Sequence, residues 1–142
     1  MIDFIALIVT GVFVALSAVH VYWALGGGAG KLAAVPELDN RPAFVPSAAS
    51  TFAVAIALAL CAVLVAASAG LIVAKVPAVS VTWLAYLLAL ALIARAVGDF
   101  RLIGFFKLVR GTRFARLDSA VYAPLCLVLG AAVFYVAVGH RA

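Results

Sequence analysis

The chain has 142 residues, 69% of them hydrophobic and 11% charged, and a formal net charge of +5. A soluble domain is about half apolar and about one quarter charged. A chain this apolar cannot cover a water-facing surface, so the composition excludes an ordinary soluble domain and indicates an integral membrane protein.

Four apolar windows are long enough to cross a bilayer as helices, at residues 4–25, 51–74, 78–97 and 120–139. Each holds close to the ~20 apolar residues that span a hydrocarbon core of ~30 Å. The windows do not alternate in polarity as barrel strands would. We predict an all-α fold, in which residues 1–142 form one domain, an integral membrane bundle of four transmembrane helices.

The first window ends in HVYWALGG, which places His20 and Trp23 on one helical face near the membrane boundary. The connection that follows, residues 26–50, is long for a link within a bundle and contains three prolines and a run of glycines. Its apolar AFVP stretch indicates that the loop folds back over the end of the bundle as a lid. A plain solvated connector is the alternative.

The third window ends in ARAVGDFR, in which Arg95 and Asp99 lie four residues apart and are expected to pair. Residues 99–118 mix phenylalanines with basic residues, a pattern that predicts an interfacial helix or an extension of the third helix. Asp118 is expected to be the N-cap of the fourth helix, with Tyr122 one turn later.

The distribution of Lys and Arg predicts the orientation of the bundle. The loops after the first and third windows share one side and carry seven of these ten residues, whereas the opposite side carries Lys75 and Arg141. We therefore expect both termini to lie outside and the two longer loops in the cytoplasm. The basic segment after the third helix would lie at the membrane surface, where anionic lipids rather than nucleic acids are the expected partners.

This orientation brings polar side chains from three helices to one depth, where ionisable groups are costly and usually functional. The set comprises His20, Arg95, Asp99, Asp118 and Tyr122, with Trp23 beside them. Taken singly, each is more simply explained as an interfacial anchor or a side chain that reaches the headgroups. Together they predict a ligand-binding or catalytic site.

Three functions stay open. The first is an amphiphile-binding pocket in which Trp23, Arg95, Arg101 and Lys107 contact a lipid or isoprenoid, oriented by the remaining polar groups of the cluster. The second is an enzyme of the isomerase or cyclase type, in which His20, Asp99, Asp118 and Tyr122 are catalytic. The third is an accessory subunit of a larger membrane complex, since small residues allow close helix contacts.

No cofactor or metal is expected. The two histidines lie at opposite depths, so they cannot hold a haem together, and the two cysteines lie inside apolar windows without metal-ligand spacing. Cys61 and Cys126 are therefore interpreted as packing residues.

Four strings together resemble a family of small bacterial integral membrane proteins known as domain of unknown function 3995. They are HVYWALGG, AVPELDNRPAFVPS, RAVGDFRLIGFFK and TRFARLDSAVYAPLCLVLG, and the resemblance covers almost the whole chain. It implies a multi-pass protein of the bacterial inner membrane with four helices, and it implies no reaction or ligand. The matching positions are His20, Trp23, Gly26, Pro36, Arg41, Pro42, Asp99, Arg101, Gly104, Lys107, Asp118 and Pro124.

Overall fold

The structure is a computed structural model that describes residues 1–38, 41–73 and 75–139. The structure has four helices that are long and apolar enough to cross a membrane, as the four apolar windows predicted. They are α1 (Ile2–Ala24), α2 (Ala48–Ser68), α3 (Ala78–Val97) and a continuous helix, Arg113–Gly139. This last helix consists of α4 (Arg113–Leu117), a π-helical turn η2 (Asp118–Tyr122) and α5 (Ala123–Gly139).

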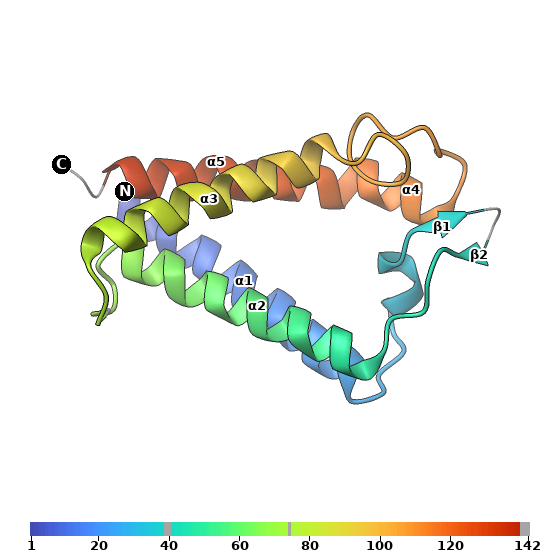
Figure 1. Cartoon of the computed structure of the whole chain (residues 1–142), viewed down its shortest axis with the longest axis horizontal. Coiled ribbons are helices and arrows are strands. Elements are labelled where there is room, and N and C mark those ends of the chain that lie inside the picture. Colours follow the sequence, from blue (N-terminus) through green and yellow to red (C-terminus); the bar gives the residue numbers. More distant parts are fainter. Residues whose placement is uncertain (39–40, 74, 140–142) are drawn as a thin grey trace.

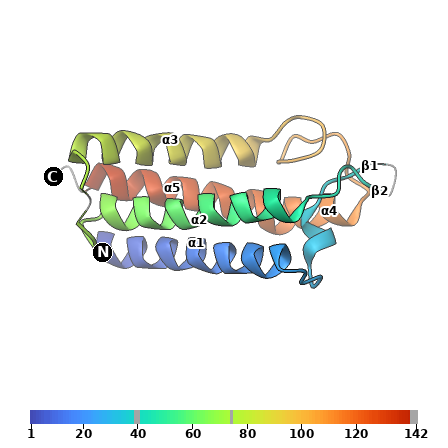
Figure 2. The ribbon, with the colours of Figure 1, turned by 60° about the horizontal axis from the view of Figure 1, so that its bottom comes forward.

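The helices form two pairs, because α1 packs mainly against α2 and α3 mainly against α5. The pairs converge at the end that holds both termini and splay apart at the opposite end (Figure 1). The loops after α1 and α3 share this splayed end, as predicted, and the α2–α3 connection lies near the termini (Figure 2). The assignment of the splayed end to the cytoplasm stays a prediction.

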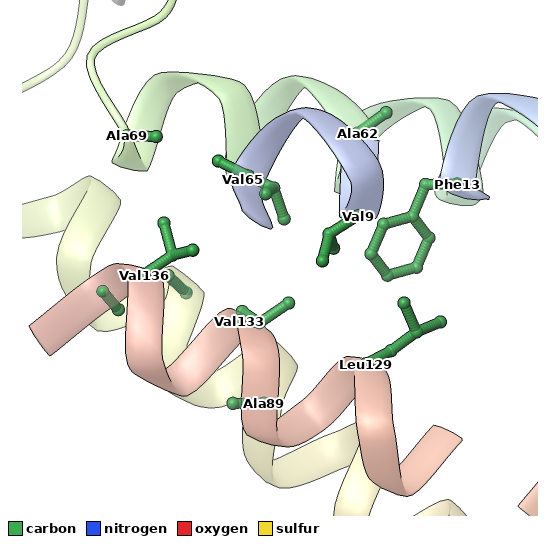
Figure 3. Close-up of a cluster of buried hydrophobic side chains, with 12 residues drawn as sticks. Val9, Phe13, Ala62, Val65, Ala69, Ala89, Leu129, Val133 and Val136 are labelled. Atoms are coloured by element: carbon green, nitrogen blue, oxygen red, sulfur yellow. The ribbon is translucent and has the colours of Figure 1, made fainter. Parts of the chain in front are cut away.

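The apolar core lies toward the converging end. Val9 and Phe13 of α1 meet Leu129 and Val133 of α5 (Figure 3), and all four are at most 4% exposed. Gly130 allows a close approach of α5 to α3, because a Cβ there would lie 3.1 Å from the Ala89 carbonyl oxygen. Small residues at such contacts let membrane helices pack through their backbones.

The loop after α1 is structured. It contains a 3₁₀ turn η1 (Lys31–Ala34) and two short antiparallel strands, β1 (Glu37–Leu38) and β2 (Arg41–Pro42). The turn and β1 both contact α4, and the Tyr122 hydroxyl donates a hydrogen bond of 3.2 Å to the Ala33 carbonyl. The loop therefore folds back over the splayed end, as its sequence indicated, and bridges the two helix pairs.

Three local predictions are wrong. The second span ends at Ser68 rather than at residue 74. Residues 99–112 form an irregular loop instead of an interfacial helix or an extension of α3. The last helix begins at Arg113 with Thr112 as its N-cap, whose hydroxyl oxygen accepts the Ala115 N–H at 3.1 Å, so Asp118 lies inside the helix.

Candidate functional site

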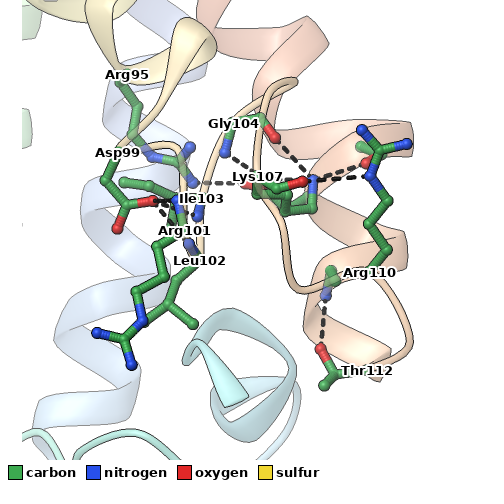
Figure 4. A network of polar contacts seen from close by, with 12 residues as sticks. Arg95, Asp99, Arg101, Leu102, Ile103, Gly104, Lys107, Arg110 and Thr112 are labelled. Carbon is green, nitrogen blue, oxygen red and sulfur yellow. Dashed lines mark hydrogen bonds and ion pairs between the residues drawn. The ribbon is translucent and has the colours of Figure 1, made fainter. Parts of the chain in front are cut away.

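Asp118 is fully buried at the splayed end and accepts three hydrogen bonds. Its Oδ1 lies 2.7 Å from Arg95 Nη2, and its Oδ2 lies 2.7 Å from the Gly104 nitrogen and 3.0 Å from Lys107 Nζ. Figure 4 shows the polar contacts of this corner. The expected pair of Arg95 with Asp99 is wrong, because the Arg95 guanidinium reaches across to the next helix instead.

Lys107 completes this group, which we name the Asp118 cluster (Arg95, Lys107 and Asp118). The Lys107 side chain is 1% exposed, and its ammonium also donates to the Gly104 carbonyl at 2.8 Å and to Ser119 Oγ at 2.7 Å. An ammonium has three N–H donors, and all three have acceptors here. The cluster thus joins α3, the loop after it and η2, and both charges of the Lys107–Asp118 pair are matched within the protein.

A π-helical turn, η2, begins at the buried Asp118. Such turns are rare, occur mostly as local bulges inside α-helices and are frequent at functional positions. Here the turn begins at Asp118 and carries the Tyr122 side chain toward the loop after α1.

The loop after α3 is held by its own polar groups rather than by a helix. Asp99 Oδ1 accepts the N–H groups of Arg101, Leu102 and Ile103 at 2.9, 2.7 and 3.0 Å. The Ile103 N–H, followed by those of Leu102 and Arg101, lowers the pKa of the Asp99 carboxyl below its usual 3.8, against an opposing effect of burial.

Two glycines close this loop. Gly98 and Gly104 adopt positive φ angles of 96° and 85°, which L-residues with a side chain rarely adopt. A Cβ on Gly98 would overlap the Ile103 carbonyl oxygen, and a Cβ on Gly104 would overlap Gly98. The Phe105 N–H then caps the end of α3 by donating to the Ala96 carbonyl at 2.9 Å.

A cavity of about 290 Å³ lies at the other side of the splayed end, between the last turn of α1, the loop after it and the first turn of α2. We name it the His20 cavity. Its lining residues are His20, Trp23, Lys31, Ala34, Val35, Phe44, Pro46, Ser50, Thr51 and Val54.

The His20 ring is fixed in one tautomer. Its Nδ1 lies 2.8 Å from the Leu16 carbonyl oxygen, which can only accept, so Nδ1 carries a hydrogen and the lone pair of the neutral ring is on Nε2. Trp23 packs edge-on against the ring at 4.9 Å between centroids and donates its own Nε1–H to the Ala29 carbonyl at 2.7 Å. No protein partner of Nε2 occurs within the described ranges.

The cavity favours negative charge. Lys31 makes one long contact, 3.5 Å from Nζ to the Trp23 carbonyl oxygen, so its ammonium retains unused donors. Ser50 and Thr51 belong to the first turn of α2, whose backbone N–H groups form the positive end of the helix dipole. No Asp or Glu is among the lining residues.

The predicted site residues thus fall into separate groups. Arg95, Lys107 and Asp118 are brought together, as are His20 and Trp23, but within the described residues His20 contacts neither Asp99 nor Asp118. Arg101 is exposed on the loop after α3. Tyr122 connects the groups indirectly, since it bonds Ala33, the neighbour of the cavity residue Ala34.

Lys31, Phe44 and Thr51 line the cavity but were absent from the sequence prediction of the site. Lys31 contributed only to the orientation, and the apolar AFVP stretch that includes Phe44 was the signal that this loop covers the bundle. In the ranges that the structure describes, no group of three or more His, Cys, Asp or Glu side chains is placed to hold a metal ion.

A family model described as Protein of unknown function (DUF3995) matches residues 13–133. No curated protein and no solved structure matches the chain. The match covers most of the chain and includes all four spans in whole or in part, and the chain belongs to the DUF3995 family.

Proposed function

We propose that this member of the DUF3995 family binds an amphiphile with an anionic head group in the His20 cavity. The observation that carries the proposal is the Lys31 ammonium, which has unused donors in a cavity without acidic lining residues. The first turn of α2 adds its positive dipole end to the same space.

The size of the cavity limits how much of an amphiphile it can enclose. Pockets that enclose a drug-sized molecule measure about 300–1,000 Å³, so about 290 Å³ fits a head group rather than a head group with its tail. Trp23, Phe44 and Val54 give the cavity apolar walls. The tail would leave past them and lie along the lipid-facing surfaces of α1 and α2.

The roles of the polar residues follow from their contacts. Lys31 would bind the anionic group, and the free Nε2 of His20 would accept a hydrogen bond from a hydroxyl of the head. We assign Arg95, Lys107 and Asp118 to the fold, since Lys107 and Asp118 are buried and bonded to each other. Binding is favoured over turnover, because His20 has no carboxylate partner among its contacts.

The test is to purify the protein in a mild detergent and identify bound amphiphiles by native mass spectrometry and lipid extraction. The wild type should retain an anionic amphiphile, and Lys31→Gln should reduce its occupancy at least several-fold. Lys75→Gln is the matched control, since Lys75 is an exposed lysine near the opposite end of the bundle. Equal retention by wild type, Lys31→Gln and Lys75→Gln would contradict the proposal.

We also propose that the protein lies in the bacterial inner membrane with both termini outside. The charge bias supports this orientation, because seven of the ten basic residues lie at the splayed end, five on its two loops and two on α4. Reporter fusions to the C-terminus test it: alkaline phosphatase should be active there and green fluorescent protein dark, and the reverse result would invert the assignment.

A further inference from the structure

The loop after α3, residues 98–112, exposes its largest apolar side chains. Phe100 is 60% exposed, Phe106 is 61% and Leu108 is 81%. The Phe100 and Phe106 rings lie 6.3 Å apart, which makes them a pair on the loop surface. Contiguous exposed apolar groups on a protein mark a site of contact with a partner or a membrane.

The backbone of this loop is held by hydrogen bonds and by a close contact between two glycines. Asp99 fixes the backbone of residues 101–103, Gly98 packs against Gly104, and Asp118 accepts the Gly104 N–H. The Val109 N–H donates to the Arg101 carbonyl at 3.0 Å and closes the far side of the loop. The phenylalanines are therefore held outward by the backbone.

The charged groups beside them are positive. Arg101, Arg110, Arg113 and Arg116 are all exposed, while Lys107 is buried against Asp118. Asp99 is the one acid between residues 98 and 117, and three backbone N–H groups already bond its Oδ1. An apolar surface surrounded by arginines suits the boundary between anionic headgroups and acyl chains.

The lengths of the helices support a position of this loop at such a boundary. The Arg113–Gly139 helix has 27 residues and α3 has 20, so at 1.5 Å per residue the former is longer by roughly 10 Å. The extra length lies at the splayed end, where the loop runs beside α4 (Figure 1). The loop thus lies beyond the end of α3 and beside a helix that extends past that end.

We propose that the loop after α3 inserts Phe100, Phe106 and Leu108 into the bilayer that the chain spans. The exposed arginines of this loop and of α4 (Arg101, Arg110, Arg113 and Arg116) would bind anionic phospholipid headgroups. This surface is separate from the His20 cavity, so either proposal can fail without the other.

Spin labels test the insertion. Single cysteines at Phe106 and, as a water-side control, at Arg41 of β2 would be labelled in a chain with Cys61→Ala and Cys126→Ala, reconstituted in nanodiscs containing phosphatidylglycerol. The Phe106 label should be more accessible to oxygen than to a water-soluble nickel chelate, and the Arg41 label should show the reverse. Nickel accessibility at Phe106 equal to that at Arg41 would overturn the proposal, because the surface would then face water. Low accessibility of the Phe106 label to both oxygen and nickel would also overturn it, because another protein would then cover the surface.

Lipid selectivity tests the arginines. Arg101 and Arg113 make no side-chain hydrogen bond among the described residues, so Arg101→Gln with Arg113→Gln should preserve the fold. The preference for bound phosphatidylglycerol over phosphatidylcholine, measured by native mass spectrometry, should fall roughly fivefold for each arginine removed. The same preference in the double variant and the wild type would overturn this part of the proposal, and Lys75→Gln controls for loss of charge elsewhere.

Discussion

The Asp118 cluster and the His20 cavity, the two polar regions of the splayed end, differ in whether their charged groups have protein partners. In the Asp118 cluster the Lys107 ammonium and both Asp118 oxygens have protein partners. In the His20 cavity, Lys31 makes one long contact and His20 Nε2 has no described partner. Lys107 and Asp118 are therefore saturated by protein partners, although Arg95 Nη1 is buried without a described partner, whereas Lys31 and His20 Nε2 keep hydrogen-bonding capacity that no described residue uses. We call the Asp118 cluster the closed corner and the His20 cavity the open corner.

The largest expected effect is the loss of Asp118. Asp118→Ala leaves Lys107 buried without a counter-charge and should lower the free energy of unfolding by about 3–5 kcal/mol, as measured by thermal unfolding in detergent. The corresponding truncation in the open corner, Lys31→Ala, should cost less than ~1 kcal/mol, since surface changes are usually small. Similar losses in both variants would remove the distinction between the corners.

A double-mutant cycle sharpens this result. Lys107→Met combined with Asp118→Leu removes both buried charges. The double variant should lose clearly less free energy of unfolding than the sum of the losses in the two single variants. Additive effects would mean that Lys107 and Asp118 do not stabilise each other.

The next largest effect is expected at Gly104. Gly104→Ala places a methyl group against Gly98 at a positive φ, a conformation that costs of order 1–3 kcal/mol without a glycine, and overlap adds to this. Unfolding should show a loss of about 3 kcal/mol. Gly111→Ala is the matched control in the same loop, because nothing lies within 4 Å of the position that its Cβ would take, and it should be near neutral.

A smaller loss of stability is expected when the hydrogen bond between Tyr122 and Ala33, which links the two regions, is removed. Tyr122→Phe removes the hydrogen bond to the Ala33 carbonyl and should cost about 1 kcal/mol. Hydrogen exchange should speed up in residues 31–35, which border the His20 cavity. Tyr135→Phe, at a tyrosine without a described hydrogen bond, should leave the exchange of this segment unchanged.

The smallest expected effect is the acid response of the loop after α3. The pKa of Asp99 is lower in the folded chain than its usual 3.8, so its stabilising contribution is present above that value and is lost as the pH falls through the folded-state pKa. The protection of the Arg101, Leu102 and Ile103 amides from hydrogen exchange, measured relative to the intrinsic rate at each pH, should therefore fall below pH 3.8. Asp99→Asn should remove this pH dependence, and an unchanged acid response in that variant would contradict the assignment.

The membrane-spanning architecture could be predicted from the sequence, and the details at the splayed end could not. Apolar length alone indicates four spans, because backbone groups in lipid must be bonded within the helix. The position of Asp118 was missed because a carboxylate near a helix start is normally a cap. In this structure Asp118 can be buried because its partners come from α3 and from the loop after it. These partners are distant in sequence, so a local pattern does not reveal them.

The loop after α3 shows a second limit of sequence patterns. The mixture of phenylalanines and basic residues suggested a helix. Asp99 instead accepts hydrogen bonds from the N–H groups that a helix would use, and Gly98 and Gly104 turn the chain. The spacing of these two glycines was the available signal. Only part of the lining of the His20 cavity could be predicted. His20 and Trp23 are close in sequence on one helix, whereas Lys31, Phe44 and Thr51 meet them only after the loop folds back.

The pairing of consecutive helices has a consequence for biogenesis. The hairpin formed by α3, the loop after it and the last helix contains Arg95, Lys107 and Asp118. Arg95 and Asp118, the first and last of these residues, are 23 positions apart in the sequence. A charged side chain enters a bilayer at a considerable cost, which falls when it is paired. The hairpin of α3 and the last helix can therefore leave the translocon with Asp118 already paired to Arg95 and Lys107. This pairing does not require α1 or α2.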